Sequence, residues 1–217
     1  MNEPQAKRRE PLWHIELAVV FAIVLQLTIA QELTIGPKYL IAIMEVMLLV
    51  ALRVIAPVTH DIASHIKRLA GLLLTAIISF ANITSLLLVL QYLIEGNHLT
   101  GKQLIFSAFA IYLTNMVIFG LWYWELDGGG HGGRGTHLPP VDFLFPQMTA
   151  PATVTQQPYW QPTFMDYLFI SITNGTAFSP TDAMPLTHRA KFLMSIQALV
   201  SLSTIALVAA RAINILV

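Results

Sequence analysis

Glu45 is the residue of this sequence best suited to chemistry, because it is ionisable and stands inside the apolar run IAIMEVMLLVALR. Arg53 follows about two helical turns later, on a similar face of a helix. An acidic side chain among apolar residues can bind a proton or a small ion, or it can form one half of a structural ion pair. The sequence leaves these two roles open.

A second stretch of interest is SITNGTAFSPTDAMPLT, residues 171–187, where Asn, Gly, Thr, Ser, Pro and Asp interrupt an apolar part of the chain. Irregular backbone at membrane depth is tolerated where it is buried in protein or lines a water-filled cavity. Ser179 before Pro180, with Asp182 close behind, is typical of a helix start, and we favour this over an extended segment. A helix N-terminus at that depth presents free N–H groups and a positive dipole end.

Polar residues also recur at helical spacing within two apolar segments. In the last segment Gln197, Ser201 and Thr204 fall on one face, and they are our candidates for lining a pore. The third segment carries a similar polar face, formed by Thr75, Ser79, Asn82 and Ser85. Such side chains also hold membrane helices together through hydrogen bonds, and the spacing by itself favours that structural role.

Metal-binding residue types occur in the loop that follows residue 124, namely Glu125, Asp127, His131 and His137. Their Gly-rich spacing neither supports nor excludes a site, and solvated loop residues are the simpler interpretation. The chain has no cysteine and no G-x-S-x-G, H-E-x-x-H or P-loop pattern. We therefore expect no enzymatic activity, no metal site and no cofactor, and a net charge of zero gives no support for nucleic-acid binding.

The elements that position these residues are expected to be membrane helices. Of the 217 residues 55% are hydrophobic and 11% are charged, whereas soluble domains carry about 25% charge. Five apolar segments reach the ~20 residues that cross a bilayer: 12–33, 38–58, 69–94, 103–124 and 190–213. Aromatic residues in LWYWE and PYWQP are typical of a membrane interface.

A short apolar run from Phe164 to Thr173 follows a Gly- and Pro-rich loop. Pro162, Thr163 and Asp166 form a capping-box pattern for a helix start, and Asn174-Gly175 is a natural stop. A helix of about ten residues is too short to cross, and its continuous apolarity favours a re-entrant position over a surface one. The expected fold is an all-α integral membrane protein with five transmembrane helices plus one re-entrant half-helix.

These elements divide the chain into four parts. We expect a cytoplasmic tail at 1–11, a four-helix transmembrane bundle at 12–124, a Gly/Pro-rich loop at 125–163, and a half-helix, break and final helix at 164–217. Short links between the first four segments predict antiparallel neighbours.

Residues 165–213 resemble the pore half of two-transmembrane potassium channels, where a pore helix, a filter and an inner helix follow one another. Asp182 and Pro185 match the D-x-x-P that ends the family's filter. The resemblance implies a filter-like segment made of Thr176, Ala177, Phe178, Ser179, Pro180, Thr181 and Asp182. Because Ser179 and Thr181 replace the family's glycines and Pro180 its tyrosine, a potassium-type carbonyl ladder is not expected. The rest, including WYWELDGGG and DFLFPQ, is similar to a family of uncharacterised bacterial multi-pass membrane proteins.

Positive residues predict how the chain lies in the membrane. One side carries Lys7, Arg8 and Arg9 before the first span, with Arg53, Lys67 and Arg68 around the second loop, whereas the other side carries only Lys38 and Lys102. By the positive-inside rule the N-terminus is cytoplasmic. The resemblance to bacterial multi-pass proteins implies that the membrane is the cell inner (plasma) membrane. The re-entrant element then enters from inside and the C-terminus lies outside, which is the reverse of the polarity of potassium channels.

These features predict an ion-channel-like pore-loop protein that mediates or regulates passage of a small inorganic ion across the lipid bilayer. One pore loop per chain requires several copies to enclose a path, so a homo-oligomer is expected. Two alternatives stay open: a non-conducting membrane scaffold or sensor whose broken helix is a docking feature, and a small transporter with its site at the broken helix.

Overall fold

The computed structural model describes residues 13–55, 61–95, 100–130, 141–151, 160–176 and 183–216, and the chain is mostly helical. The long helices are α1 (Trp13–Thr28), α2 (Lys38–Ile55), α3 (Asp61–Glu95), α4 (Gly101–Leu126) and α8 (His188–Leu216). The shorter elements are η1 (Gln31–Leu33), η2 (Asp127–Gly129), β1 (Phe143–Leu144), α5 (Pro146–Thr149), α7 (Phe164–Gly175) and β2 (Met184–Pro185).

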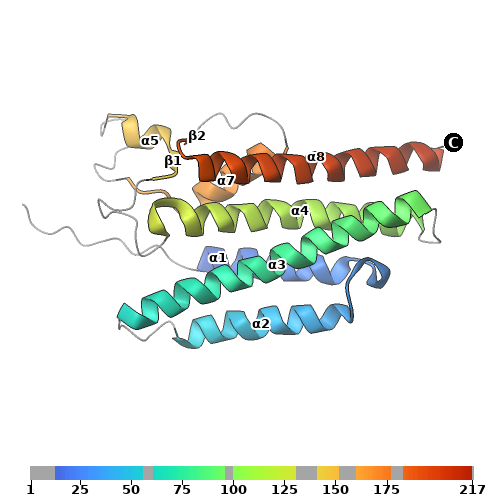
Figure 1. The fold of residues 1–217 in the computed structure, drawn as a ribbon, viewed down its shortest axis with the longest axis horizontal. Helices are drawn as coiled ribbons and strands as arrows, with labels where there is room; N and C mark the ends of the chain where they lie inside the picture. The colour runs from blue at the N-terminus through green and yellow to red at the C-terminus, as the bar shows by residue number, and fades with distance from the viewer. Residues whose placement is uncertain are drawn as a thin grey trace, which may run out of the picture.

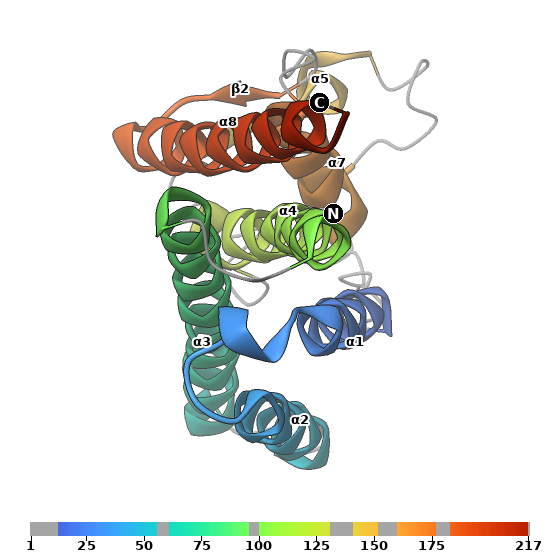
Figure 2. The ribbon, with the colours of Figure 1, turned by 90° about the vertical axis from the view of Figure 1, so that its right-hand side faces the viewer.

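Helix α4 forms the centre of the molecule. Seen end-on, α8 and α7 lie on one side of α4, α1 and α3 lie on the other, and α2 packs outermost against α1 and α3 (Figure 2). Among the apolar helices that are long enough to cross a membrane, α4 is the most buried and α8 the least. Every other long helix except α2 packs directly on α4. Helix α4 therefore connects the half that contains α7 and α8 to the half that contains α1, α2 and α3.

Hydrogen bonds between helices show that α1, α3 and α8 all run antiparallel to α4 (Figure 1). The end of α1 meets the start of α4, where Ala30 N donates to Ser107 Oγ at 3.1 Å. Near the other end of α4, Trp122 Nε1 donates to Ser79 Oγ at 3.0 Å, and Arg189 at the start of α8 donates to Leu126 O at 2.9 Å. The predicted alternation of helix directions is therefore present in the structure.

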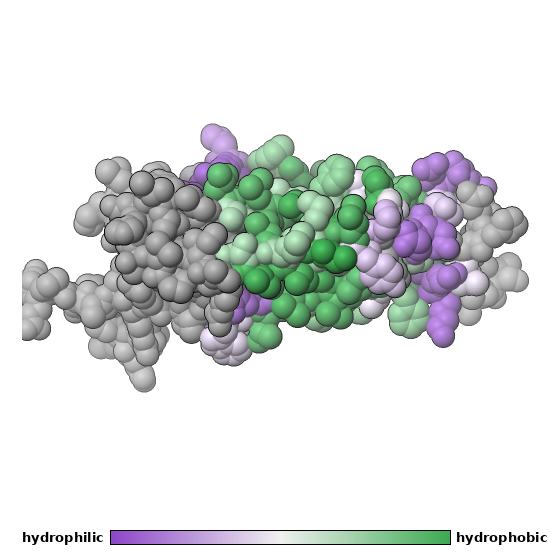
Figure 3. All heavy atoms as spheres, turned by 90° about the horizontal axis from the view of Figure 1, so that it is seen from below, coloured by the Kyte–Doolittle hydropathy of each residue, from purple (hydrophilic) through white to green (hydrophobic). Residues whose placement is uncertain are grey.

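The surface has the character of a membrane protein. Three helical stretches are long and apolar enough to cross a bilayer: Arg68–Glu95, Gly101–Leu126 and His188–Ala209. Large apolar side chains are exposed along the long helices, and the face in Figure 3 shows an apolar middle with hydrophilic residues at both ends. An exposed apolar band of this extent is stable only when lipid or another protein surface covers it.

Two of the five predicted spans are shorter than expected. Helix α1 has 16 residues and α2 has 18, which corresponds to about 24 and 27 Å at 1.5 Å per residue. The chain leaves α1 after Thr28 and forms a 3₁₀ turn at Gln31–Leu33, and Gly36 with a φ of 72° turns it toward α2. Hydropathy alone had merged this turn into the first helix.

Local capping signals place the helix starts well. Thr100 and Gln103 form a capping box at the start of α4, and Thr163 with Asp166 forms the predicted one at the start of α7. Helix α7 ends at Gly175, as Asn174-Gly175 predicts. Helices α3 and α8 extend beyond their apolar segments, because polar residues at their ends stay helical.

The structure contains a two-stranded β-ladder, which the predicted all-α fold did not include. Strands β1 and β2 pair antiparallel, with Phe143 opposite Pro185 and Leu144 opposite Met184. The ladder ties the segment after α4 to the segment before α8. Strands of two residues show no alternating pattern that a sequence can reveal.

Candidate functional site

Helix α7 lies beside only one half of α4. Near its first turn, the Tyr167 hydroxyl donates a hydrogen bond to Asp127, at the C-terminal end of α4. At its last residue, Gly175 O accepts a hydrogen bond of 3.2 Å from the Tyr112 hydroxyl, near the middle of α4. Only a few residues later, Met184 pairs with Leu144, back beside the C-terminal end of α4. The chain therefore comes in and goes out at one end of the bundle (Figure 1).

A cluster of polar side chains joins α7 to α4 and α8 in the interior. Gln197 of α8 is fully buried, and its Oε1 accepts hydrogen bonds from the Tyr123 hydroxyl at 2.6 Å and from Asn174 Nδ2 at 2.9 Å. Its Nε2 donates to Ser171 O at 2.8 Å and to Ser171 Oγ at 2.7 Å. Three of the four hydrogen bonds of this amide therefore hold α7, and the fourth joins α8 to α4.

Further hydrogen bonds extend this cluster along both faces of α7. Ser171 Oγ donates to Met116 O at 2.6 Å. Asn174 Nδ2 also donates to Met194 O at 2.9 Å. Asn115 Nδ2 of α4 donates to Ser201 Oγ of α8 at 3.0 Å. We call the set the α7 polar cluster; its members are Tyr112, Asn115, Tyr123, Ser171, Asn174, Gln197 and Ser201.

Glycine lets the end of α7 approach this cluster closely. A Cβ atom on Gly175 would lie 3.2 Å from Ser201 Oγ and 3.4 Å from Gln197 Nε2. On the facing helix, a Cβ on Gly120 would lie 3.2 Å from the Leu168 Cα. Small residues at such points allow helix backbones to pack closely, as is usual in membrane proteins.

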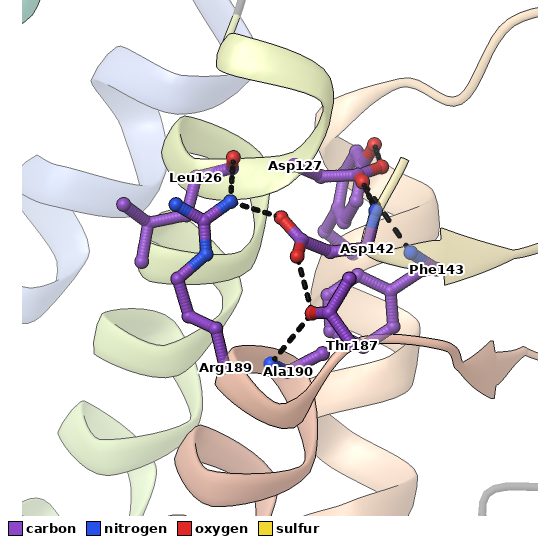
Figure 4. Close-up of polar contacts among 8 residues, drawn as sticks. Leu126, Asp127, Asp142, Phe143, Thr187, Arg189 and Ala190 are labelled. Atoms are coloured by element: carbon purple, nitrogen blue, oxygen red, sulfur yellow. Dashed lines mark hydrogen bonds and ion pairs between the residues drawn. The ribbon is translucent and has the colours of Figure 1, made fainter. Parts of the chain in front are cut away.

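A second polar cluster closes the end of the bundle where α4 stops (Figure 4). Asp127 accepts hydrogen bonds from the backbone N–H groups of Asp142 and Phe143 and from the Tyr167 hydroxyl. Asp142 accepts from Thr187 Oγ1 and from Arg189, which also donates to Leu126 O. Thr187 Oγ1 in turn accepts from Ala190 N at 3.2 Å and so caps the start of α8. We call this set the end clasp; the side chains that form it are those of Asp127, Asp142, Tyr167, Thr187 and Arg189.

The electrostatics of the end clasp differ between its two acids. Asp142 pairs with the half-exposed guanidinium of Arg189. Asp127 is 1% exposed, and burial raises the pKa of its carboxyl above the usual value. The three hydrogen bonds that Asp127 accepts lower this pKa, and the negative charge of Asp142 raises it further, but burial is the largest influence.

The predicted pore-lining residues lie in the helix interface of a single chain. Gln197 and Ser201 belong to the α7 polar cluster, and the Thr204 hydroxyl donates to Val200 O in its own helix at 2.8 Å. In α3, the Thr75 and Ser79 hydroxyls donate to backbone carbonyls one turn back, and Ser79 also accepts from Trp122. Such contacts are typical of side chains that hold helices together, which is the structural role that the spacing favours.

The filter-like segment is only partly described. The hydroxyl of Thr176 donates to Ile172 O at 2.8 Å, and its backbone N–H donates to the same carbonyl at 3.0 Å, so this residue caps the end of α7. Ala177, Phe178, Ser179, Pro180, Thr181 and Asp182 lie outside the described residues, and so does the helix start predicted at Pro180.

Glu45 is fully buried in α2, and the polar side chain that faces it is Gln26 of α1. Within the described part of the chain, neither carboxyl oxygen of Glu45 has a hydrogen-bond partner. The side chain of Arg53 lies outside that part, so the ion pair with Glu45 stays a prediction.

The loop acids do not assemble into a metal site in the described residues, where no group of three or more His, Cys, Asp or Glu side chains could hold an ion. Asp127 serves the end clasp instead. Glu125 is buried against Gly71 of α3, where its Oε1 would lie 3.0 Å from an added Cβ. His131 and His137 fall outside the described residues.

Several residues of the two clusters escaped the sequence reasoning. Tyr123 belongs to the aromatic group assigned to the membrane interface, but it is fully buried. Asp142, Ser171 and Asn115 carried no periodic signal of their own, and Asn174 had been singled out only as a helix stop. Arg189 after Thr187 was a usable clue, since Thr is a common N-cap and a positively charged residue within the first turn is costly beside the positive helix end unless an acid pairs with it.

Comparison with protein-family models, with curated proteins and with solved structures finds no match to this chain. The functional argument therefore rests on the geometry of the chain itself.

Proposed function

We propose that this protein is an ion-channel-like membrane protein in which five helices cross the bilayer and α7 is a re-entrant half-helix. One observation carries the proposal. Helix α7 begins beside Asp127, ends beside Tyr112 near the middle of α4, and the chain is back beside Asp142 by Leu186, whose N–H donates to Asp142 O at 2.8 Å. A chain that comes in and returns at the same end matches the re-entrant elements of channels and transporters.

The dimensions support this proposal. The 12 residues of α7 span about 18 Å, which is roughly half of a ~30 Å hydrocarbon core. Its C-terminal end therefore reaches the middle of the bundle. Because the C-terminal end of a helix carries a partial negative charge, it favours a cation over an anion at that depth. We propose a small inorganic cation as the ion.

The orientation follows from the positive residues. Arg189 binds Leu126 O, and Arg68 lies near Gly130, so both stand at the C-terminal end of α4. Lys102 stands at the opposite end of the same helix. The positive-inside rule favours the Arg189 end as the cytoplasmic one. We therefore propose that α7 enters from the cytoplasmic face of the cell inner membrane and that the C-terminus lies outside.

The exposed face of α8 supports an oligomer. Phe192, Leu199 and Leu202 are each about two-thirds exposed, and α8 packs on its own chain through α4, α7 and β2. One half-helix per chain cannot enclose an ion path, so we propose that several copies assemble with their α7 ends toward a shared path.

Cysteine labelling in liposomes tests the proposal, because the natural chain contains no cysteine. In Thr176→Cys, a charged thiol reagent added from the cytoplasmic side should modify the introduced thiol and reduce cation flux. Phe80→Cys is the control in α3, on an exposed apolar face away from α8; its lipid-facing thiol should stay unmodified by the same reagent. Flux that equals that of empty liposomes, together with a thiol at position 176 that reacts from neither side, would contradict the proposal.

A non-conducting scaffold or sensor is the second candidate, and one observation favours it. The side chains of the α7 polar cluster are hydrogen-bonded to one another or to the backbone, which is the arrangement of a rigid interface. In this alternative α7 is a fixed plug. The same labelling experiment separates the two functions, since a scaffold keeps its thiol at position 176 protected and shows no flux.

A further inference from the structure

The unsatisfied polar atoms of the described residues are confined to one half of the fold. Buried side-chain atoms without a hydrogen-bond partner occur in Gln26, Glu45, Asn82 and Thr114, one residue in each of α1 to α4. The α7 polar cluster on the other side of α4 has none among its described members. Buried polar groups without partners are rare in folded proteins and call for an explanation, such as a redox or catalytic role or an unseen ion.

Glu45 is the only ionisable member of this group, so its protonation state matters most. It is 0% exposed and both of its oxygens lack a hydrogen-bond partner in the described part of the chain. An ionised carboxylate without partners in such surroundings is very costly, because neither water nor a counter-charge offsets the lost hydration. A neutral carboxylic acid avoids that cost at the same position.

We propose that Glu45 is a proton-binding site inside the bundle, between α1 and α2, and that it is occupied by a proton in the folded protein at neutral pH. Gln26 is the polar group that faces this site. Its amide can accept from the acid O–H or donate to the carbonyl oxygen after a small rotation. This site is separate from α7 and does not depend on the proposed ion path.

The surroundings favour a proton over a metal ion. A metal cation such as Mg²⁺ or Ca²⁺ needs about six oxygen ligands around one point, whereas a proton needs a single oxygen. In the described residues no cluster of three acidic, His or Cys side chains exists. Among the described residues of the two helices that pack on α2, the charged ones stand near helix ends: Glu16 in α1, and Arg68 and Glu95 in α3. His14 also stands near the start of α1. No described charge from these helices therefore faces Glu45.

Carbodiimide labelling provides the test, because these reagents react with protonated carboxyl groups. The carboxyl oxygen bonds to the central carbon of the reagent and the acid proton passes to a reagent nitrogen, so no further reactant is required. In the full chain in liposomes, the membrane-soluble dicyclohexylcarbodiimide should modify Glu45 at neutral pH. A water-soluble carbodiimide should leave Glu45 unmodified. Peptide mass spectrometry locates the adduct.

Two matched variants make the result specific. Glu45→Gln should remove the adduct, and its infrared spectrum should lose one carboxylic-acid C=O band. Its melting temperature should equal that of the wild type, because Gln mimics the neutral acid. Glu32→Gln, the same change at an exposed position outside the long helices, should leave the Glu45 adduct in place. The adduct should decrease as the pH is raised.

Three results would overturn the proposal. Absence of the adduct in the folded protein, with its appearance after denaturation, would mean that Glu45 is ionised or shielded. Equal modification by the water-soluble reagent would mean that the site is open to water. Protection by Na⁺ at constant pH would mean that the carboxyl binds a metal cation in place of a proton.

Discussion

Gln197 offers the sharpest test of how α7 is held. The substitution Gln197→Met keeps the length and apolar packing of the side chain but removes four hydrogen bonds: two that it accepts, from Tyr123 and Asn174, and two that it donates to Ser171. Side-chain hydrogen bonds in a membrane protein are worth about 0.6 kcal/mol each on average, with a maximum near 1.7. Four of them correspond to about 2–3 kcal/mol, allowing for the partners that Ser171 and Asn174 keep.

The measurement is equilibrium unfolding in mixed micelles, followed by tryptophan fluorescence, to which Trp122 and Trp124 in α4 contribute. Thr114→Val is the control, since it removes a buried hydroxyl that has no hydrogen-bond partner among the described residues and keeps the shape of the side chain. It should change the free energy of unfolding by less than about 0.5 kcal/mol, or raise it. A double-mutant cycle of Gln197→Met with Tyr123→Phe should give a coupling of about 0.6–1.7 kcal/mol.

The reasoning is refuted if Gln197→Met has the same free energy of unfolding as the wild type, or if Thr114→Val lowers that free energy by as much. Either result would mean that packing alone holds α7, and that the hydrogen bonds of the α7 polar cluster are replaced equally well in the unfolded state within the micelle.

Three further predictions concern the neighbours of α7. Gly120→Ala should cost about 1–3 kcal/mol in the same unfolding assay, because its Cβ would press on the Leu168 backbone; wild-type stability would show that α7 shifts freely. Thr163→Ala should cost about 0.5–2 kcal/mol by removing the capping box with Asp166, while an unchanged midpoint would exclude that cap. The raised pKa of Asp127 means that the folded state holds this proton more tightly than the unfolded state. Its contribution to stability is therefore complete below the ordinary value of 3.8 and declines as the pH rises through the raised value. Asp127→Asn should thus gain stability relative to the wild type as the pH rises, and a parallel pH profile for the two proteins would contradict this.

The sequence predicted α7 well because its signals are local. Thr163 and Asp166 stand three residues apart, and Asn174-Gly175 closes the same short segment. Helix lengths were less well predicted, since hydropathy shows where apolar residues lie and not where hydrogen bonding ends. Helix α3 therefore begins at Asp61, well before its apolar residues, and the first apolar segment contains a turn after Thr28 that no apolar pattern marks.

The two polar clusters could not be predicted from spacing, because their members are distant in sequence. Gln197 was found from its helical face, but its partner Tyr123 is 74 positions away. Asp142 and Arg189 are 47 positions apart and meet only because β1 pairs with β2. Periodicity describes one helix at a time, whereas these contacts depend on how α4, α7 and α8 are placed relative to each other.

The position of α7 between α4 and α8 has a consequence for biosynthesis. Residues 164–175 emerge from the ribosome before residue 197 does, so the amide that satisfies Ser171 and Asn174 is not yet beside α7 when α7 appears. Polar side chains such as Ser171 and Asn174 have no stable place in lipid while they lack hydrogen-bond partners. If α7 is re-entrant as we propose, it should therefore stay at the membrane surface until α8 has inserted, and it should be the last element to take its place. In the proposed arrangement, failure of α8 to insert would leave α7 outside the bilayer, where quality-control proteases can reach it.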